Sequence, residues 1–223
     1  MTTPIRALCA AALSLGAAVA HANVQITEFE YNGNGDGAGG TAEFVELTNL
    51  GASAIDFTGW SFDDSSRTAG SFSLSVLGIV AAGETVLISE GTAAAFRSAW
   101  GLASSVKVAG GNTNNLGRSD EINIFDAGGT LVDRLTYGDQ VYAGTVRAAT
   151  ASANPLALAD LAPQTGTPTW LLATTGDSFG SYASVNGDIA NPGVFLLAVP
   201  EPSSYALLLA GLGLVAGAAR RRA

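Results

Sequence analysis

The chain has 223 residues, with ten lysines and arginines against nineteen aspartates and glutamates, which gives a formal net charge of −9 at pH 7. This charge argues against binding to the phosphate backbone of a nucleic acid, because such binding depends on clustered basic side chains. The single cysteine excludes an internal disulfide.

The N-terminus has the three regions of a secretory signal peptide in order. The first region, residues 1–6, is a short segment with one positive charge, and the second, residues 7–19, is apolar and rich in alanine. In the third region, Ala20 and Ala22 are the small residues that signal peptidase accepts around its cleavage site. We therefore expect residues 1–22 to be a signal peptide that signal peptidase removes by cleavage after Ala22.

Cleavage at this position would remove the only cysteine and the only histidine, Cys9 and His21. The exported chain would then lack the groups needed for Ser-His-Asp or Cys-His triads and for zinc sites built from histidine or cysteine. Between Asn23 and Val199 the chain keeps six basic and eighteen acidic residues, a formal charge of −12. This charge favours solubility and attracts cations.

Short segments rich in β-branched and aromatic residues recur through residues 23–139, each bounded by Gly, Asn or Asp. The predicted strands are Val24–Tyr31, Ala42–Asn49, Glu84–Ser89, Glu121–Asp126 and Thr130–Tyr137. In the first strand the apolar phase slips between Ile26 and Phe29, which indicates a β-bulge. The last two strands alternate apolar and polar residues, as strands with one buried face do, and a turn at residues 126–129 joins them into a hairpin.

One segment, Thr92–Gly101, has the pattern of a short helix. Thr92 is a suitable N-cap, and Gly101 a suitable stop. Many short strands with one short helix predict an all-β fold, an antiparallel β-sandwich.

The loop between the first two predicted strands resembles a calcium-binding loop. Asn32, Asn34 and Asp36 stand at alternate positions, Gly37 allows a sharp turn, and Glu43 occupies the twelfth position. The first ligand is Asn where Asp is usual, and strands flank the loop in place of helices. A plain hairpin tip, in which glycines adopt positive φ, therefore stays open as the alternative. Calcium is the one cofactor that the sequence brings into consideration.

Several landmarks follow one another in a characteristic order along residues 24–139. They are Glu43–Asn49, Thr58–Phe62 with Trp60, Ile79–Ile88 with Gly83, Asn115–Asp126 and Val132–Asp139. The series resembles the lamin tail domain, an immunoglobulin-like sandwich found in nuclear lamins and in many secreted bacterial proteins. The resemblance implies that Trp60 is a core plug beneath the sheet and that Gly83 is the turn residue before Glu84–Ser89. The family's eukaryotic members are associated with chromatin and filaments, but the charge of −12 opposes a nucleic-acid partner here.

Residues 140–199 are dominated by Ala, Thr, Gly, Pro and Asn, and we expect a loop-rich extension that packs on the sandwich and ends as a tether. Trp100, Trp170 and Tyr182 could bind a carbohydrate if they were exposed. Core positions are favoured for the two tryptophans, because Trp100 closes an apolar helical face and Trp170 precedes two leucines.

A glycosidase would need two carboxyl groups that face one cleft. Glu43 and Glu46 are three apart on a predicted strand, so they point to opposite faces and cannot pair. Glu28 and Glu30 share a face, but we expect them to be solvated. A carboxylate-based hydrolase is therefore the least favoured reading.

The C-terminus has an apolar run followed by basic residues. Ser203–Ala219 is uncharged and about 25 Å long as a helix, at the short end of what spans a bilayer. Arg220, Arg221 and Arg222 follow, and basic residues prefer the cytoplasmic side. This predicts a transmembrane helix at residues 203–219 with stop-transfer arginines, and a body outside the inner membrane.

The residues ahead of this helix, Val199, Pro200, Glu201 and Pro202, complete a tripartite ending. Residues 200–223 with Val199 resemble the PEP-CTERM sorting signal of Gram-negative bacteria. The resemblance implies that a membrane-embedded exosortase recognises the Pro-Glu-Pro element and processes the tail. It also implies a membrane-anchored precursor and a mature form at the cell surface, outer envelope or extracellular matrix.

The sequence thus predicts a non-catalytic, exported surface or matrix-associated structural or interaction module. Its expected processing partners are signal peptidase and exosortase, with the inner membrane as host of the precursor. Exopolysaccharide and surface proteins are candidate partners of the mature body. A calcium-dependent or carbohydrate-binding surface module is the alternative.

Overall fold

The computed structural model describes residues 24–35, 43–161 and 165–197. The predicted signal peptide, Asp36, the sorting motif and the predicted transmembrane helix lie outside these residues. Within the described ranges, no helix combines the length and the apolar character needed to cross a bilayer.

Two mixed sheets form the body. The six-stranded sheet has the order β13 (Trp170–Leu172), β11 (Ala153–Pro155), β1 (Val24–Glu30), β2 (Phe44–Asn49), β7 (Thr85–Ser89) and β8 (Val108–Gly110). The five-stranded sheet has the order β12 (Thr165–Gly166), β10 (Leu131–Tyr137), β9 (Asp120–Phe125), β4 (Ser61–Asp63) and β5 (Phe72–Ser73). Neighbouring strands are antiparallel except for the parallel pairs β7–β8 and β10–β12.

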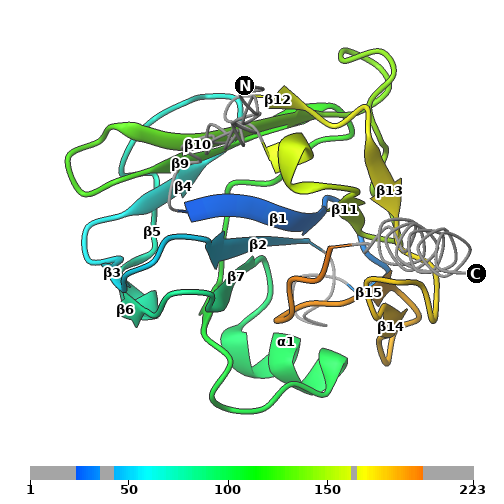
Figure 1. Cartoon of the computed structure of the whole chain (residues 1–223), viewed down its shortest axis with the longest axis horizontal. Helices are drawn as coiled ribbons and strands as arrows, with labels where there is room; N and C mark the ends of the chain where they lie inside the picture. The colour runs from blue at the N-terminus through cyan, green and yellow to red at the C-terminus, as the bar shows by residue number, and fades with distance from the viewer. Residues whose placement is uncertain (1–23, 36–42, 162–164, 198–223) are drawn as a thin grey trace, which may run out of the picture.

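The remaining elements are short. Two small sheets pair β3 (Ile55–Asp56) with β6 (Ile79–Val80) and β14 (Tyr182–Ala183) with β15 (Ile189–Ala190). The helical elements are η1 (Ser75–Leu77), α1 (Ala93–Trp100) and η2 (Leu158–Leu161). In the view of Figure 1, β4, β9 and β10 lie above β1, β2 and β7, and α1 lies below them.

The main core fills the space between the two large sheets. Phe29 and Leu47 enter it from the six-stranded sheet, and Phe62, Ile122 and Tyr137 enter it from the five-stranded sheet. The predicted all-β, immunoglobulin-like sandwich with one short helix is confirmed.

A bulge in β1 accounts for the slip of the apolar phase that the sequence shows. Ile26 is opposite Leu47 and Glu28 is opposite Glu46, so Thr27 is an extra residue in β1. Ile26 therefore points into the main core, and Phe29 returns to it after the bulge. The side chains of Glu28 and Glu30 consequently lie on the opposite, outer face of the sheet.

Helix α1 covers part of this outer face. The Thr92 side chain accepts a hydrogen bond from the Ala95 N–H, and Gly101 ends the helix in the left-handed region at φ 63°, as predicted. Phe96 and Trp100 of α1 pack on Phe44 of β2, at ring-centroid distances of 5.5 and 6.0 Å. The six-stranded sheet is thus buried on both faces over this area.

The prediction that Trp60 is the core plug is wrong. Trp60 is only partly buried and stacks on Phe57 at 4.5 Å, whereas Phe57 and Phe62 are fully buried. Gly83 does turn the chain into β7, with φ 75° and its N–H donating to the Asn49 carbonyl.

The residues after 139 complete both large sheets. β11 pairs with the outer edge of β1, β13 pairs with β11, and β12 pairs with β10. Residues 181–197, here called the C-terminal segment, contain β14 and β15 and donate backbone hydrogen bonds to glutamates on the outer face of β1 and β2. This part of the chain is therefore structural, because it supplies sheet edges and a cover.

Candidate functional site

Four carboxylates gather under the C-terminal segment on the outer face of the six-stranded sheet. Glu28 and Glu30 come from β1, Glu46 from β2, and Asp188 from the turn before β15. Each has an exposed fraction of 0%. We call these four residues the acidic cluster. Their burial corrects the prediction that Glu28 and Glu30 are solvated, since the C-terminal segment covers the face that the strand pattern leaves open.

Only one of the two carboxylate oxygens of Glu28 has hydrogen-bond partners in the described ranges. Its Oε1 accepts hydrogen bonds from the Ser152 hydroxyl and from the Asn191 N–H at 3.0 Å, with the Asn154 amide at 3.4 Å. Its Oε2 is buried and has no hydrogen-bond partner in the described part of the chain. Burial raises the pKa of Glu28 to about 7, although the hydrogen bonds oppose this shift.

Glu46 is directly opposite Glu28 in the β1–β2 register. Its Oε1 accepts from the Thr27 hydroxyl at 2.8 Å, and its Oε2 accepts from the Gly193 N–H at 2.7 Å. Burial and then the neighbouring Glu28 raise the pKa of Glu46 well above its usual value. Two strands and the C-terminal segment are therefore joined through carboxylates.

Glu30 and Asp188 have unpaired oxygens. Neither oxygen of Glu30 has a hydrogen-bond partner among the described residues, and the same holds for Oδ2 of Asp188. The other oxygen, Oδ1 of Asp188, accepts from the Asn34 N–H at 2.7 Å. Burial raises the pKa of Glu30 to about 9, and the negative charges of Asp188 and Glu28 add to the shift.

Basic side chains do not compensate the acidic cluster. The six basic residues between Asn23 and Val199 all fall in the described ranges. The ion pairs found there are Arg67–Glu121, Arg134–Glu121, Lys107–Glu84 and Arg118–Asp139. None of these ion pairs involves a member of the acidic cluster. Buried carboxylates without a paired cation are costly in free energy when they are charged.

The structure describes three of the four residues of the predicted calcium loop, Asn32, Asn34 and Glu43, while Asp36 lies outside the described residues. Glu43 is buried at 4% exposure, and both its oxygens are taken: Oε1 by the Asn112 amide at 3.1 Å and Oε2 by the Leu116 N–H at 2.6 Å. Burial raises its pKa to about 8. Asn32 forms a β-bridge with Ala149, and Asn34 bonds Asp188 through its backbone.

Within the described ranges, no three His, Cys, Asp or Glu side chains are arranged to hold a metal ion as they stand. Asp188 could not be predicted as a member of the acidic cluster, because it lies more than 150 residues from Glu28 along the chain. The one local signal was the turn-rich stretch Gly187–Gly193, which marks a turn but not its neighbours.

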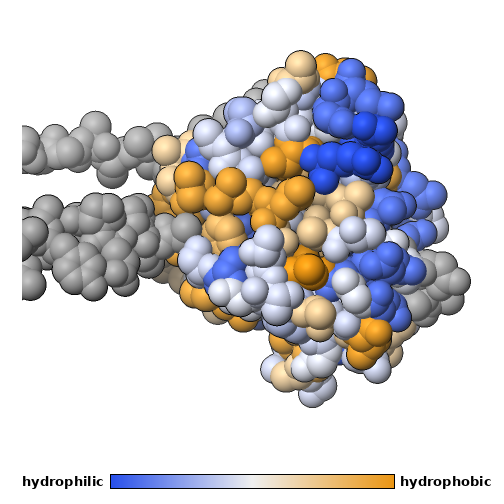
Figure 2. Space-filling view, turned by 90° about the vertical axis from the view of Figure 1, so that its right-hand side faces the viewer, coloured by the Kyte–Doolittle hydropathy of each residue, from blue (hydrophilic) through white to orange (hydrophobic). Residues whose placement is uncertain are grey.

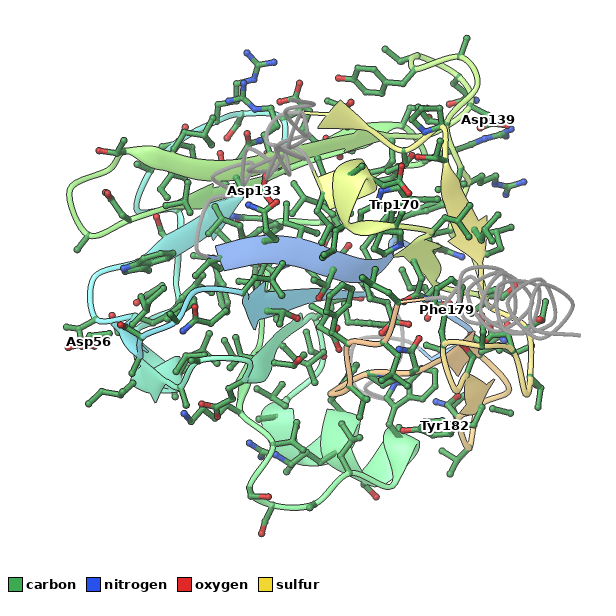
Figure 3. The ribbon with its side chains drawn as sticks, in the orientation of Figure 1. Asp56, Asp133, Asp139, Trp170, Phe179 and Tyr182 are labelled. Carbon is green, nitrogen blue, oxygen red and sulfur yellow. The ribbon has the colours of Figure 1, made fainter. Side chains whose placement is uncertain are left out.

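The aromatic residues considered for carbohydrate binding are mostly internal. Trp100 and Trp170 are each 2% exposed, as the preference for core positions predicted. Tyr182 reaches the surface at 36% exposure, and its hydroxyl donates to the Trp100 carbonyl at 2.9 Å, beside α1 (Figure 3). These three side chains therefore form no aromatic platform for a sugar ring.

Two surface pockets lined by described residues do not offer a catalytic pair of carboxylates. A pocket of about 550 Å³ between β2, β7 and residues 193–195 contains one carboxylate, Glu84, which is paired with Lys107 at 2.8 Å. A smaller pocket of about 170 Å³ contains only Asp160. Neither pocket has the two facing carboxyl groups that glycoside hydrolysis uses.

Apolar side chains gather toward one side of the face shown in Figure 2, next to a more hydrophilic area. The exposed apolar residues near β13 and in the C-terminal segment are Leu171, Leu172, Val185, Val194 and Leu196.

Comparison with protein-family models gives two matches. The model for the Lamin Tail Domain matches residues 17–139, and the model for the PEP-CTERM protein-sorting motif matches residues 198–222. Both are non-catalytic domain types, and both resemblances inferred from the sequence are confirmed. Comparisons with curated proteins and with solved structures gave no significant match.

Proposed function

Because the chain belongs to the lamin tail domain family and ends in a PEP-CTERM sorting motif, we propose that it is a non-catalytic structural or interaction module of the cell surface or extracellular matrix. The sorting motif makes it an exported protein that an exosortase sorts. The order of the two matches carries the proposal, since a folded body precedes a terminal sorting motif.

The proposed route uses both ends of the chain. Signal peptidase removes residues 1–22, and the apolar run at 203–219 holds the precursor in the inner membrane, with Arg220–Arg222 on the cytoplasmic side. Exosortase then acts at Val199–Pro202, and the mature body reaches the outer envelope or matrix of a Gram-negative cell. Exopolysaccharide and surface proteins are the proposed neighbours there.

The absence of catalysis is supported by the chemistry of the described residues. They include no cysteine or histidine, and the buried carboxylates Glu28, Glu43 and Glu46 accept internal hydrogen bonds. The pockets described above each contain a single carboxylate. A calcium-dependent surface role is a second proposal, and the bond between Asn34 and the buried Asp188 favours it, since this bond brings the predicted calcium loop to the acidic cluster.

Replacement of the sorting residues tests the proposal. We expect the double variant Pro200→Ala, Glu201→Ala to accumulate as full-length precursor in the membrane fraction, as followed by immunoblot of fractionated cells. The matched control Ser203→Ala, Ser204→Ala changes two residues next to the motif and should be processed as the wild type is. Normal processing of the double variant would contradict recognition of the motif by exosortase.

A further inference from the structure

The last described stretch of the chain, residues 191–197, is bonded to the six-stranded sheet through two glutamates. The Asn191 N–H donates to Oε1 of Glu28 at 3.0 Å, and the Gly193 N–H donates to Oε2 of Glu46 at 2.7 Å. Glu28 and Glu46 are directly opposite each other in the β1–β2 register, and both are fully buried. The Asn191 side chain bonds only within the C-terminal segment. In the described ranges, the hydrogen bonds from this stretch to the sheet therefore end on carboxyl groups.

No basic side chain among the described residues forms an ion pair with these two glutamates. Lys107 pairs with Glu84, and Arg97 of α1 donates to the Val106 carbonyl. The other titratable groups on the surrounding elements are acidic or phenolic: Glu30 of β1, Asp177 after β13, and Tyr182 and Asp188 of the C-terminal segment. Like charges directly opposite each other on neighbouring strands destabilise a sheet, and burial makes each charge more costly.

We propose that Glu28 and Glu46 form a pH-sensitive latch, in which their protonated carboxyl groups hold residues 191–197 on the sheet and loss of the protons frees this stretch. A protonated carboxyl group keeps an oxygen that accepts the N–H bond of Asn191 or Gly193. Ionisation places two negative charges side by side in a buried site, and release of the stretch lets water solvate both.

The pH range of the latch follows from the burial of the two groups. Burial raises the pKa of Glu28 to about 7, and burial followed by the charge of Glu28 raises the pKa of Glu46 well above its usual value. Hydrogen bonds from Asn191 and Gly193 act in the opposite direction, but burial outweighs them. A raised pKa stabilises the closed state at low pH, and this contribution is lost as pH rises through the raised value. The latch is therefore closed near pH 5 and weakens through pH 7 and above.

The release is confined to residues 191–197, because other contacts hold the rest of the C-terminal segment. Within that rest, β14 pairs with β15, and Ile189 exchanges backbone hydrogen bonds with Thr150 and Ser152. Beyond Pro192 the apolar contacts are weaker. Val194 and Leu196 are 53% and 45% exposed, and Phe195 is partly buried against the main core.

The freed stretch would lengthen the tether between the body and the sorting motif, because residues 191–197 lead directly to it. This consequence rests on the proposed function, whereas the latch itself does not. The two are tested apart, since the latch is measured on purified protein and the processing of Pro200→Ala, Glu201→Ala is measured in cells.

Hydrogen–deuterium exchange of the purified full-length chain in detergent tests the latch. Exchange is followed by mass spectrometry between pH 5 and pH 8, and protection factors are corrected for the intrinsic pH dependence of exchange. Peptides covering residues 190–197 report on the latch, and peptides covering β9 report on the main core. Each glutamate shifts the opening equilibrium by up to about tenfold per pH unit below its raised pKa, so the protection of residues 190–197 relative to β9 should fall at least tenfold over this range. A constant ratio would overturn the proposal.

Three glutamine variants assign the effect to the two glutamates. Glu28→Gln and Glu46→Gln keep an oxygen that accepts the N–H bond but cannot ionise, so each should reduce the pH dependence and the double variant should abolish it. Glu43→Gln is the matched control and should keep the wild-type profile, because Glu43 is also buried with a raised pKa but bonds Asn112 and Leu116. An unchanged profile in the double variant, or loss of the pH dependence in Glu43→Gln, would overturn the assignment.

Discussion

The variant Glu30→Gln should make the protein more stable at neutral pH when no divalent cation is present. Glu30 is fully buried, and its oxygens have no hydrogen-bond partner in the described ranges. Burial, followed by the negative charges of Asp188 and Glu28, raises its pKa to about 9. In the unfolded chain its pKa is near 4.5. Between these values the folded state binds more protons than the unfolded state, so the stability falls as pH rises from about 4.5 through about 9.

The size of the effect follows from the shift. Each pH unit above 4.5 costs up to about 1.4 kcal/mol for a group that stays protonated only in the folded state. At pH 7 the cost for Glu30 is about 3 kcal/mol, and at pH 5 it is below about 1 kcal/mol. Glutamine does not titrate, so Glu30→Gln removes this cost. The pKa values of Glu28 and Glu43 are also raised, by smaller amounts, and these two residues are present in both the variant and the wild type.

Urea unfolding followed by tryptophan fluorescence, in EDTA at pH 5, 7 and 8, measures the difference. We expect Glu30→Gln to exceed the wild type by about 2–3 kcal/mol at pH 7, a Tm difference of roughly 5–10 °C, and to be close to it at pH 5. An advantage that does not change with pH, or a variant that is less stable at pH 7, would refute the reasoning.

Two further predictions concern the core and the surface. Phe29→Ala should lower the free energy of unfolding in urea by about 3–5 kcal/mol, because Phe29 is fully buried and its ring centroid lies 4.4 Å from that of Tyr137. Phe72→Ala, at a partly buried position in an edge strand, should lower it clearly less. Equal losses of stability in the two variants would contradict this assignment of the core. Glu121 should contribute a pH dependence of stability opposite in sign to that of Glu30, since hydrogen bonding from Arg67 lowers the pKa of Glu121 to about 2. Its contribution is present above pH 4.5 and lost as pH falls toward 2, so Glu121→Gln should flatten the acid limb of the stability profile measured by thermal unfolding; an unchanged limb would argue against it.

Local pattern was enough to predict much of the sandwich. The bulge in β1 follows from a slip of apolar phase between Ile26 and Phe29, and α1 follows from Thr92 and Gly101 at its ends. These features depend on a few neighbouring residues, so one sequence carries them. The sorting motif is also local, which is why it could be identified without a structure.

Features that depend on tertiary contacts could not be predicted. β11, β12 and β13 are two or three residues long, too short to show a period, although they complete both large sheets. The burial of Glu28 and Glu30 depends on a segment more than 150 residues away, and strand alternation cannot tell a solvated face from a covered one. Trp60 stacks on Phe57 and stays partly exposed, whereas the smaller Phe57 and Phe62 are fully buried in the core, a difference that the sequence pattern does not show.

Mass spectrometry of the protein recovered from the cell surface tests most directly whether the two ends are sorting labels around a non-catalytic body. The mature form should begin at Asn23 and lack the apolar run and the terminal arginines beyond Pro202. Recovery of the intact chain from the cytosol, with residues 1–22 and 203–223 still attached, would contradict this account.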